Sequence, residues 1–396
     1  MPRILRIINR LNLGGPTFNV AYLTKFLSPE YETMLVAGMI DESEAPSEFI
    51  LHDMGLKPVY IPEMYRKIHL SKDVRAYLKL KKIIRDFKPD IVHTHAAKAG
   101  ALGRMAASAC HVPVILHTFH GHVFHSYFSN LKSNVFINIE RQLAKRTTRL
   151  IAISKKQKIE LSEEFRIAPA DKIEIIPLGF DLGKFSENVE VKRKKFRSHY
   201  LIDDDETVIS IVGRIVPVKN HRLFLFALKN VLTRTHKKVR AFIIGDGEDR
   251  QAIEELARTL QIDSSDFIAE KRKTTLTFAS WVKEVDEVYA GSEIVALTSL
   301  NEGTPVSIIE ALAANKAVVT TDVGGISDMV IDKKNGFIVP TNDVEALSGA
   351  LLQLVENNQL RNSMESFPEA NIIERFSYMR LVKDMSDLYS RLLHSA

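Results

Sequence analysis

Short apolar runs alternate with longer amphipathic segments along the first half of the chain. Each apolar run is followed by a segment whose apolar residues recur at helical spacing, and then the next run begins. This alternation predicts parallel strands joined by crossover helices, which is the α/β doubly wound arrangement. The expected strands are residues 3–8, 32–39, 90–95, 113–119, 149–154 and 172–180, and the expected helices are 18–27, 73–87 and 99–110.

A second series with the same alternation begins after residue 204. Between the two series lies EVKRKKFRSHYLIDDDE, a charged stretch without an apolar period, which we interpret as a connection whose carboxylates are solvated. Because one hydrophobic core rarely organises 396 residues, we predict two Rossmann-like domains, at 1–183 and 205–377, joined by a linker at 184–204. In the second series the expected strands are 207–213, 240–247, 276–282, 293–299, 317–323 and 336–340, and the expected helices are 221–232, 249–260 and 307–314. Residues 378–393 show the pattern of a last amphipathic helix.

Composition supports a folded protein that works in a reducing compartment. The chain is 45% hydrophobic and 26% charged, and Cys110 is its only cysteine, so no internal disulfide is expected. The start, MPRILRIINRLNLGG, lacks the apolar core of a signal peptide. No later run approaches about 18 consecutive apolar residues, so we expect no membrane-spanning helix. We therefore expect a cytoplasmic protein.

The net charge of +5 conceals an asymmetry between the two halves. Residues 1–200 carry 32 Lys and Arg against 20 Asp and Glu, whereas residues 201–396 carry 22 against 29. The cations of the first half are spread over amphipathic patterns such as YLKLKKIIRDFK and are not gathered with aromatic residues, which argues against a nucleic-acid partner. Two interpretations stay open, a plain solvated surface and a face that rests peripherally on the anionic inner membrane.

The segment NEGTPVSIIEA, at 301–311, combines two carboxylates with a helix start. Glu302 lies on the loop after an expected buried strand, Thr304 is a candidate N-cap, and Pro305 suits the first helical position. Glu310 then lies about 9 Å along the helix, too far for a capping box. Free N–H groups at the helix start favour an anion such as a diphosphate. A surface position beside Ser307 remains the alternative for Glu310, and an exposed loop position the alternative for Glu302.

Two further segments carry candidate phosphate-binding groups. In SIVGRIVPVKN, Arg214 and Lys219 follow a strand end, and two cations there could hold a diphosphate and stabilise its charge as it leaves. Gly14 and Gly15, in LNLGGPTFNV, would let the backbone approach a phosphate or a sugar closely. Ordinary surface charge and a plain tight turn are the alternatives, because the glycine pair matches neither the dinucleotide fingerprint nor a Walker motif.

The histidines of HTFHGHVFH and HTH suggest a metal site, which we set aside. His117, His120, His122 and His125 have no accompanying H-E-x-x-H motif, cysteine pair or carboxylate cluster, so no metal is expected. His120 follows a strand end and precedes a glycine. It could instead hydrogen-bond a sugar hydroxyl or a phosphate.

Several of these segments, taken in order, resemble a known family. GRIVPVKN, IIGDGEDR, SLNEGTPVSIIEALAANKAVVTTDVGG and NGFIVP resemble the donor half of the retaining glycosyltransferases of family 4, which have the GT-B fold. INRLNLGGP, DIVHTHAAKAGALGR, HTFHGHVF, LIAIS and IPLGFDLGKF look like the landmarks of the same family's acceptor domain. The resemblance covers nearly the whole chain. Its most specific element is the E-x7-E formed by Glu302 and Glu310.

The resemblance implies a role for each candidate residue. Glu302 would contact hydroxyls of the donor sugar, and Glu310 would hold the ribose diol of the nucleotide. Arg214 and Lys219 would bind the diphosphate. Backbone N–H groups near Gly303, Thr304 and Val306 would help to bind the diphosphate, and Gly15 would approach the donor closely. His120 would contact the sugar and support the transition state. The last helix, 378–396, would pack back on the N-terminal domain.

The family also implies the type of reaction. Its members usually need no metal, so we expect no cofactor. In the front-face displacement usually assumed for retaining members, the leaving phosphate takes the proton of the acceptor. Two departures concern the donor contacts: Thr304 and Pro305 stand where Phe-Gly is common, which removes one backbone donor, and Leu178 stands where Asn is common.

The sequence therefore predicts a metal-independent retaining hexosyltransferase of cell-surface polysaccharide synthesis. The donor is expected to be a nucleotide-diphosphate sugar of the UDP-sugar kind, and the acceptor a lipid-linked or growing glycan. Two alternatives remain: a nucleotide-sugar 2-epimerase of GT-B fold, which would form an epimer without an acceptor, and a non-catalytic nucleotide-sugar-binding protein, which would show no turnover.

Overall fold

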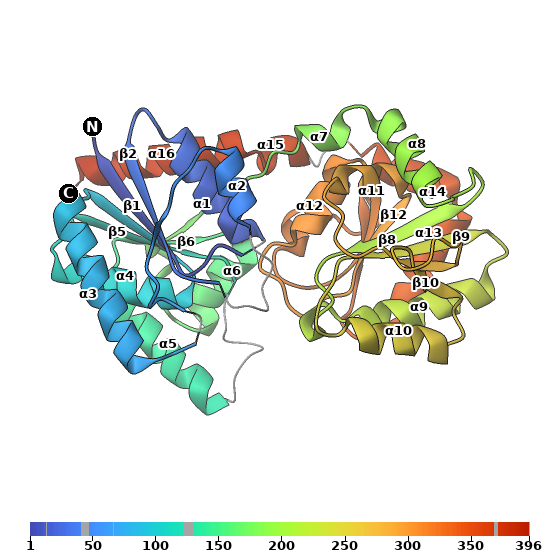
Figure 1. Cartoon of the computed structure of the whole chain (residues 1–396), viewed down its shortest axis with the longest axis horizontal. Helices are drawn as coiled ribbons and strands as arrows, with labels where there is room; N and C mark the ends of the chain where they lie inside the picture. The colour runs from blue at the N-terminus through green and yellow to red at the C-terminus, as the bar shows by residue number, and fades with distance from the viewer. Residues whose placement is uncertain (13, 41–46, 66, 122–129, 368–370, 396) are drawn as a thin grey trace. The chain divides into compact units, whose positions relative to one another are not determined.

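The chain folds into two compact units. The computed structural model describes residues 1–12, 14–40, 47–65, 67–121, 130–367 and 371–395. Unit 1 consists of Met1–Phe180 and Arg375–Ala396, and unit 2 is Asp181–Glu374 (Figure 1). Each unit has a central sheet covered by helices.

The described residues of unit 1 form a seven-stranded sheet in which every pairing is parallel. The strand order is β3-β2-β1-β4-β5-β6-β7. The inner strands are buried on both faces, which explains their nearly continuous apolar sequences. The strand bounds are β1 Arg3–Ile8, β2 Glu32–Ala37, β3 Val59–Tyr60, β4 Ile91–His95, β5 Val114–Phe119, β6 Arg149–Ala152 and β7 Ile173–Ile175.

Helices cover both faces of this sheet (Figure 1). Leu5 and Ile7 of β1 belong to one apolar cluster with residues of α3 and α4, whereas Ile4 belongs to another with residues of α1 and α16. The C-terminal helix is therefore part of the core of unit 1. The helix bounds are α1 Gly15–Phe26, α2 Glu48–Asp53, α3 Leu70–Phe87, α4 Ala97–Ala109, α5 Asn130–Lys145, α6 Lys155–Ile159 and α16 Tyr378–His394. The short helix α15, Ile372–Arg375, contains the boundary at which the chain passes from unit 2 to unit 1.

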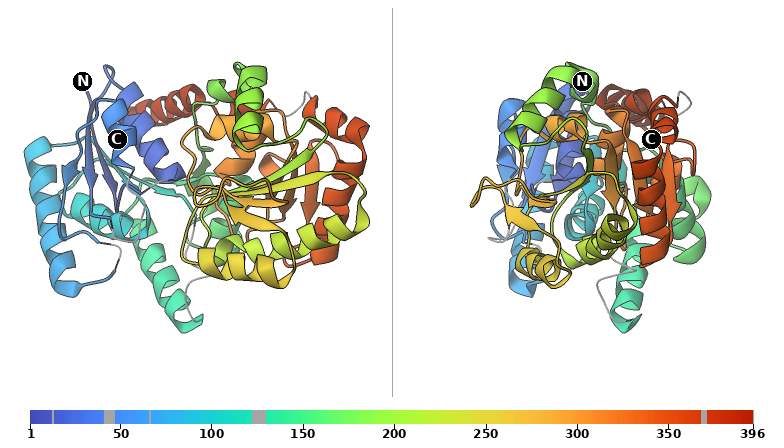
Figure 2. Two further views of the ribbon diagram at one scale, coloured as in Figure 1. Left: turned by 45° about the vertical axis from the view of Figure 1, so that its right-hand side comes forward. Right: turned by 90° about the vertical axis from the view of Figure 1, so that its right-hand side faces the viewer.

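Unit 2 repeats this architecture with its own parallel sheet (Figure 2). The strand order is β10-β11-β9-β8-β12-β13-β14, and the two sheets confirm the predicted α/β doubly wound class. The strands are β8 Thr207–Val212, β9 Val239–Ile244, β10 Ser264–Asp266, β11 Leu276–Phe278, β12 Ile294–Leu297, β13 Ala317–Thr321 and β14 Gly336–Val339. The helices are α7 Gly183–Ser186, α8 Val189–His199, α9 His221–Arg234, α10 Arg250–Thr259, α11 Val285–Gly291, α12 Val306–Ala313, α13 Val344–Glu356 and α14 Asn358–Glu365.

Each sheet has one point at which the strand order reverses. In unit 1 the reversal lies between β1 and β4, and in unit 2 it lies between β8 and β12. The loops that leave such neighbouring strands diverge to opposite faces of the sheet, so a crevice opens at the carboxyl ends of the strands. The residues directly after β1, β4, β8 and β12 are therefore the positions to inspect for a site.

The stretch 184–204 is not the linker that we expected. It belongs to unit 2, where α8 packs against α11. Phe196 is buried in a cluster with Val208 and Phe242, and Gly291 leaves room for its ring, because a Cβ there would lie 2.2 Å from Phe196 Cδ1. A helix with so few buried apolar residues gives a weak periodic signal in the sequence.

Ion pairs from α8 to residues 94 and 100 positions away explain its charged sequence. Lys192 pairs with Asp286 at 3.0 Å, and Arg193 pairs with Glu293 at 2.6 Å. The carboxylates that follow α8 are not all solvated either, since Glu206 is buried and lies 3.0 Å from Lys273. The charges of this stretch stabilise the packing of unit 2.

The start of α16 crosses the chain just before unit 2 begins. The Phe180 N–H donates to Phe376 O at 2.8 Å, and the Tyr378 N–H donates to Phe180 O at 3.0 Å. Arg380 donates to Leu178 O at 2.7 Å. Gly179 lies inside this crossing, where an added Cβ would lie 2.6 Å from Leu381 Cβ and 2.8 Å from Ser377 O.

We expect Gly179→Ala to destabilise the protein by about 1–3 kcal/mol, because the new Cβ overlaps backbone atoms that cannot move independently. The measurement is the free energy of unfolding in urea. Gly349→Ala is the matched control: Gly349 lies inside α13 with nothing within 4 Å of an added Cβ, so alanine should stabilise by about 0.5–1 kcal/mol. Equal effects of the two substitutions would contradict the crossing described here.

Candidate functional site

In unit 2, the loops after β8 and β12 meet at the strand-order reversal. Leu300 donates its backbone N–H to Val218 O at 2.8 Å, and the Thr298 hydroxyl donates to Lys219 O at 2.9 Å. The loop after β9 packs against the loop after β8 so closely that a Cβ on Gly245 would lie 2.0 Å from Gly213 O. Glycine is therefore required at Gly245, which also has φ +136°.

This junction brings together two of the predicted residues, Lys219 and Glu302. Lys219 Nζ lies 2.5 Å from Glu302 Oε1, with 22% and 12% of the two side chains exposed. The Ser299 hydroxyl donates to the same carboxylate oxygen at 2.6 Å. Ser299 is itself buried, and its carbonyl accepts from the Thr321 hydroxyl at 2.7 Å. Glu302 is thus held through one oxygen and is not the exposed loop carboxylate that we kept as an alternative.

The loop after β13 packs against the backbone of the segment that carries Glu302. Gly325 donates its N–H to Gly303 O at 2.8 Å. Gly324 has φ +54°, and a Cβ on it would lie 2.2 Å from Glu302 O, so both its conformation and its surroundings require glycine. The sequence DVGG therefore fixes the backbone on which Glu302 is mounted.

The helix start after Glu302 differs from the expectation by one residue. Thr304 does not act as the N-cap; Pro305 does, and α12 begins at Val306. The reason is the backbone of Pro305, whose ψ of 107° is extended and not helical. Thr304 is buried, and its hydroxyl has no hydrogen-bond partner among the described residues. The N–H groups of the first helical turn still face this end, as at any helix start.

Glu310 is partly buried on α12, not on a solvent-facing stripe. It is the fifth helical residue, about 6 Å along the axis from Val306. The hydroxyl of buried Tyr289 donates to Glu310 Oε2 at 3.0 Å. Burial raises the pKa of Glu310 to about 7, although the hydrogen bond from Tyr289 and the charge of Lys184 act in the opposite direction. The carboxylate is therefore a poorly solvated acceptor.

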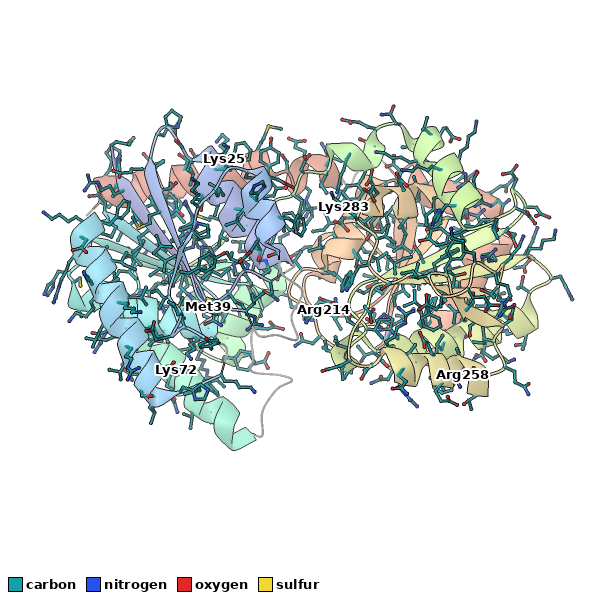
Figure 3. The ribbon with its side chains drawn as sticks, viewed as in Figure 1. Lys25, Met39, Lys72, Arg214, Arg258 and Lys283 are labelled. Atoms are coloured by element: carbon teal, nitrogen blue, oxygen red, sulfur yellow. The ribbon has the colours of Figure 1, made fainter. Side chains whose placement is uncertain are left out.

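Arg214 also lies after β8, but its side chain is exposed (Figure 3). Within the described residues, the structure records no hydrogen bond or ion pair of its guanidinium group. Arg214 is thus an exposed cation, unpaired among the residues that the structure describes, on the loop that carries Lys219. Arg214, Lys219, Glu302, Gly303, Thr304, Val306 and Glu310 all belong to unit 2.

In unit 1, His120 follows β5 and contacts the histidine at the end of β4. His95 Nδ1 lies 2.9 Å from His120 Nε2, and the two rings are stacked with centroids 5.2 Å apart. Burial lowers the pKa of His120 to about 3 and lowers that of His95 well below its ordinary value. Both rings are therefore neutral near pH 7, and one N–H lies between them.

The sequence did not predict the buried polar groups that adjoin the His95–His120 pair. His93 Nδ1 lies 2.6 Å from the Tyr389 hydroxyl of α16, and His93 Nε2 lies 2.7 Å from the Thr118 hydroxyl. Arg6 is fully buried, with its guanidinium carbon 6.0 Å from the centroid of the Tyr389 ring. The period-two alternation of HTH was the available signal, because His93 and His95 face the same side of β4.

Gly14 and Gly15 start α1 after β1. Gly14 is the N-cap residue, with φ 154° and ψ 172°, and Gly15 is the first helical residue, buried. Pro16 occupies the second helical position. The two glycines and His120 belong to unit 1. His122 and His125 lie outside the described residues.

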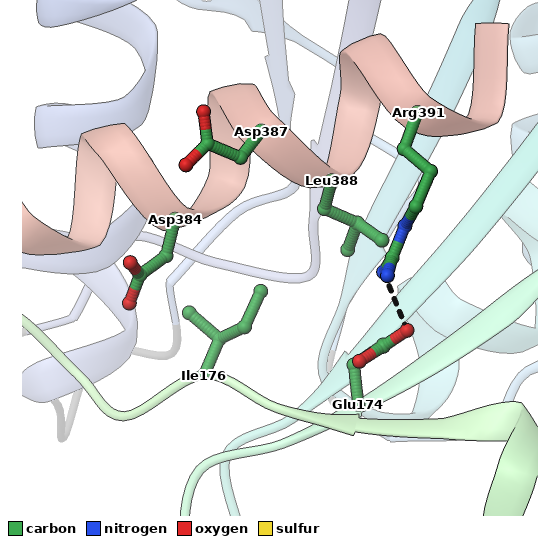
Figure 4. Close-up of a pocket in the computed structure, with 6 residues that line it drawn as sticks. All are labelled: Glu174, Ile176, Asp384, Asp387, Leu388 and Arg391. Carbon is green, nitrogen blue, oxygen red and sulfur yellow. Dashed lines mark hydrogen bonds and ion pairs between the residues drawn. The ribbon is translucent and has the colours of Figure 1, made fainter. Parts of the chain in front are cut away.

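A surface pocket in unit 1 lies elsewhere, between the end of β7 and α16 (Figure 4). Its carboxylates are already paired: Glu174 with Arg391 at 2.6 Å, Asp384 with Arg380 at 2.9 Å and Asp387 with Lys383 at 2.7 Å. The pocket therefore offers no unpaired carboxylate to a ligand.

The described residues contain neither a metal-binding cluster nor a membrane-spanning helix. Within those ranges, no group of three or more His, Cys, Asp or Glu side chains is arranged to hold a metal ion. In the same part of the chain, no helix combines the length and the apolar character needed to cross a bilayer.

Comparisons with known proteins cover both units. Residues 13–184 match the family described as Glycosyltransferase Family 4, and residues 192–367 match Glycosyl transferases group 1. An Escherichia coli protein described as UDP-Gal:alpha-D-GlcNAc-diphosphoundecaprenol alpha-1,3-galactosyltransferase is 30% identical over 341 residues, 85% of this chain and 84% of that protein. The capsular polysaccharide biosynthesis glycosyltransferase CapM of Staphylococcus aureus is 25% identical, over 84% of this chain and 85% of that protein.

Among solved structures, Anabaena Alr3699/HepE in complex with UDP superposes on this chain with a TM-score of 0.80. The sequence identity is 17%, and the superposition covers 98% of this chain and 100% of that one. The same Anabaena protein in complex with UDP-glucose gives a TM-score of 0.79 at 18% identity, over 99% of this chain and 100% of that chain. The fold is therefore shared along the full length.

We expect Glu310→Gln to raise stability more at pH 8 than at pH 5. The pKa of Glu310 is raised from 4.5 to about 7 in the folded chain, so the ionised form is penalised on folding. This penalty is absent below about pH 4.5, grows as the pH rises, and is complete above about pH 7, at no more than about 3 kcal/mol. Glutamine removes it. Urea unfolding at both pH values measures the difference.

Glu345→Gln is the matched control, because Glu345 lies on α13 with 76% of its side chain exposed. Its effect should stay within a few tenths of a kcal/mol at both pH values. If Glu310→Gln shifted stability equally at pH 5 and pH 8, the burial of the Glu310 carboxylate would be refuted.

Proposed function

The chain belongs to glycosyltransferase family 4 and has the GT-B fold, and from this premise we propose that it transfers a sugar from a UDP-sugar to a lipid-linked or growing glycan, with retention of anomeric configuration. The activity is that of a glycosyltransferase of cell-surface glycan synthesis. The observation that carries the proposal is the Lys219–Glu302 pair at the carboxyl ends of β8 and β12, with Glu310 on the adjoining helix. The UDP complexes of the Anabaena protein and the UDP-Gal donor of the E. coli relative support the choice of donor.

The donor site can be derived from unit 2 alone. Lys219 uses one of its three N–H donors on Glu302, so the others remain for a diphosphate. Arg214 lies on the same loop and adds a bidentate donor. The N–H groups at the start of α12 provide further anion contacts. These groups stabilise the charge that grows on the diphosphate as the sugar–phosphate bond breaks.

The two glutamates suit the two hydroxylated ends of a nucleotide sugar. Glu310 has one oxygen on Tyr289, and the other can accept from the ribose diol. Glu302 has Oε1 on Lys219 and Ser299, which leaves Oε2 for hydroxyls of the donor sugar. Burial lowers the pKa of both His95 and His120 and so keeps both rings uncharged, and His120 serves as a neutral hydrogen-bonding group and not as a cation. The leaving phosphate takes the proton of the acceptor hydroxyl, and no side-chain nucleophile or metal takes part.

The acceptor side of the proposal concerns unit 1. The E. coli relative is named for an acceptor linked to diphosphoundecaprenol. A lipid-linked acceptor places the reaction at a membrane surface, and the excess of cations in the first half of the chain suits an anionic leaflet. We therefore include peripheral association with the inner face of the membrane in the proposal.

The direct test is transfer from radiolabelled UDP-hexoses and UDP-N-acetylhexosamines to undecaprenyl-diphosphate sugars, with the anomeric configuration of the product read by NMR. Transfer with retained configuration is the expected result. Formation of an epimer without any transfer would instead assign the 2-epimerase activity, and donor binding without turnover would assign a binding protein.

We expect Lys219→Met and Glu302→Gln to lower kcat/KM for the donor by about 10²–10³, because each removes a preorganised charge beside the reacting diphosphate or sugar. Ser299→Ala should have a smaller effect, about tenfold, since it removes only the hydrogen bond that orients Glu302. Lys271→Met and Glu284→Gln change exposed charges of unit 2 and serve as controls that should keep full activity. Initial-rate kinetics over a range of donor concentrations measures all five variants.

We expect His95→Ala to lower kcat about tenfold with little change in the donor KM, because His120 loses the partner that fixes its proton. In the wild-type enzyme, the pair should contribute no inflection to the rate near pH 6.5, since burial lowers the pKa of both imidazoles below their ordinary value. His236→Ala, which changes an exposed histidine of unit 2, is the control. An imidazole titration near pH 6.5 that disappears in His95→Ala would overturn this description.

A further inference from the structure

The hydroxyl of Tyr289 is a buried polar group that the packing of unit 2 does not explain. Tyr289 lies on α11 and is fully buried, and its ring meets that of Phe185 of α7 edge-on, with centroids 5.7 Å apart. The helices α7, α11 and α12 pack against one another (Figure 1). A phenylalanine ring would fill the same space, so the hydroxyl needs an explanation of its own.

This hydroxyl makes a directional contact with Glu310 of α12. Within the described residues its one recorded partner is Glu310 Oε2, at 3.0 Å. Burial and the nearby carboxylate raise the pKa of Tyr289 well above its ordinary value, so the phenol keeps its proton and remains a donor. A buried hydroxyl is costly unless it is hydrogen-bonded, so the bond to Glu310 is the interaction that a tyrosine supplies here and a phenylalanine would not.

The two carboxylate oxygens of Glu310 differ in their access to a ligand. Oε2 is occupied by Tyr289. Oε1 has no recorded partner among the residues that the structure describes, and, unlike the Thr304 hydroxyl, it is not shut off from solvent. A turn of the carboxylate would exchange the two oxygens, and the bond from Tyr289 opposes that turn. Glu310 therefore presents one acceptor oxygen in a fixed orientation.

The charges around Glu310 leave this contact without a competitor. Helix α7 contributes Lys184, α11 contributes Asp286 beside Tyr289, and the strands β12 and β13 behind α12 carry no charged residue. Lys184 favours the ionised carboxylate, whereas burial and Asp286 oppose it. In the described part of the chain no ion pair of Glu310 is recorded, so the Tyr289 hydroxyl is the direct contact that orients the carboxylate.

We infer that Tyr289 is a positioning residue, which orients Glu310 toward the ribose of the donor and so makes the enzyme selective for ribonucleotide sugars. Tyr289 does not touch the donor and acts through Glu310. A carboxylate oxygen can accept two hydrogen bonds, so both hydroxyls of a vicinal diol can converge on Oε1, whereas a deoxyribose supplies only one. The inference rests on the proposed function, in which Glu310 holds the ribose diol.

Donor binding should then be coupled to the loss of a proton. The pKa of Glu310 is about 7 in the free chain, because burial outweighs the hydrogen bond from Tyr289. Two donated hydrogen bonds from the ribose favour the ionised carboxylate, so donor affinity rises with pH through about 7 and levels off above it. The diphosphate of a UDP-sugar is a diester that does not titrate near neutral pH, and it adds no inflection of its own.

The test is donor kinetics of Tyr289→Phe and the wild type between pH 6 and pH 8. We expect the variant to raise KM for the UDP-sugar about tenfold and to change kcat less than about twofold, because the hydroxyl orients an acceptor away from the reacting bond. The wild-type KM should fall by up to about tenfold across this range. In the variant the inflection should move to higher pH, since the bond that lowers the pKa of Glu310 is lost.

Tyr31→Phe is the matched control. Tyr31 is a buried tyrosine of unit 1 whose hydroxyl donates to Ser386 O at 3.4 Å, so the substitution removes a similar bond far from Glu310 in the fold. It should keep the wild-type KM, kcat and pH profile. Glu310→Gln tests the assignment of the inflection independently, because it should abolish the pH dependence of KM.

A 2′-deoxy-UDP-sugar measures the selectivity directly. The wild type should show a KM for it at least about tenfold higher than for the ribonucleotide donor, and Tyr289→Phe should reduce this ratio about threefold or more. An unchanged ratio and pH profile in Tyr289→Phe would overturn the inference, as would an inflection that persists in Glu310→Gln. A loss of kcat alone, equal for both donors, would assign Tyr289 a purely structural role and would also overturn it.

These outcomes are distinct from a failure of the proposed function. Absence of both binding and transfer of UDP-sugars by the wild type would remove the proposed function. Normal transfer by the wild type, with Tyr289→Phe indistinguishable from it, would leave the proposed function in place and remove only the role of Tyr289.

Discussion

The ion pair between Lys219 and Glu302 is the interaction around which the loops at one end of the sheet of unit 2 are organised. It joins the loops that leave β8 and β12, the two neighbouring strands from which the sheet of unit 2 is wound in opposite directions. Ser299 fixes the carboxylate, and Gly324 and Gly245 allow neighbouring loops to pack against this backbone. Each of the two charges compensates the other, so that removal of either one would leave a partly buried charge without its partner.

The polar groups at the strand ends differ in charge between the two units. Unit 2 uses paired and partly exposed charges, together with one carboxylate, Glu310, whose pKa is raised by burial. Unit 1 has a chain of neutral imidazoles behind the loops after β4 and β5, and it is connected to the C-terminal helix by the contact between His93 and Tyr389. The last helix therefore packs in the core of unit 1 and also fixes the ring of His93 through Tyr389.

The fold class could be predicted from the sequence, and so could the loops and the helix that carry the proposed donor residues. Periodicity reports apolar burial, so the buried parallel strands and the helices with one apolar side were found. The helix α8 was missed, because charges that pair with residues 94 and 100 positions away leave no periodic signal. The proposed roles of Glu302, Arg214 and Lys219 rest on the order of the motifs. The contacts could not be predicted, because a sequence does not show that Lys219 and Glu302 bind each other. Nor does it show that Tyr289 donates to Glu310 or that His95 contacts His120. The helix start at Thr304 was misplaced by one residue because the extended ψ of Pro305 depends on the loop that precedes it.

A crystal structure of the protein with a UDP-sugar would show directly whether the ends of β8 and β12 form the donor site. We expect the diphosphate within hydrogen-bonding distance of Lys219 and Arg214, the ribose hydroxyls on the carboxylate of Glu310, and the sugar hydroxyls on the second oxygen of Glu302. A nucleotide bound away from the ends of β8 and β12, or a ribose that leaves Glu310 on Tyr289 alone, would contradict it.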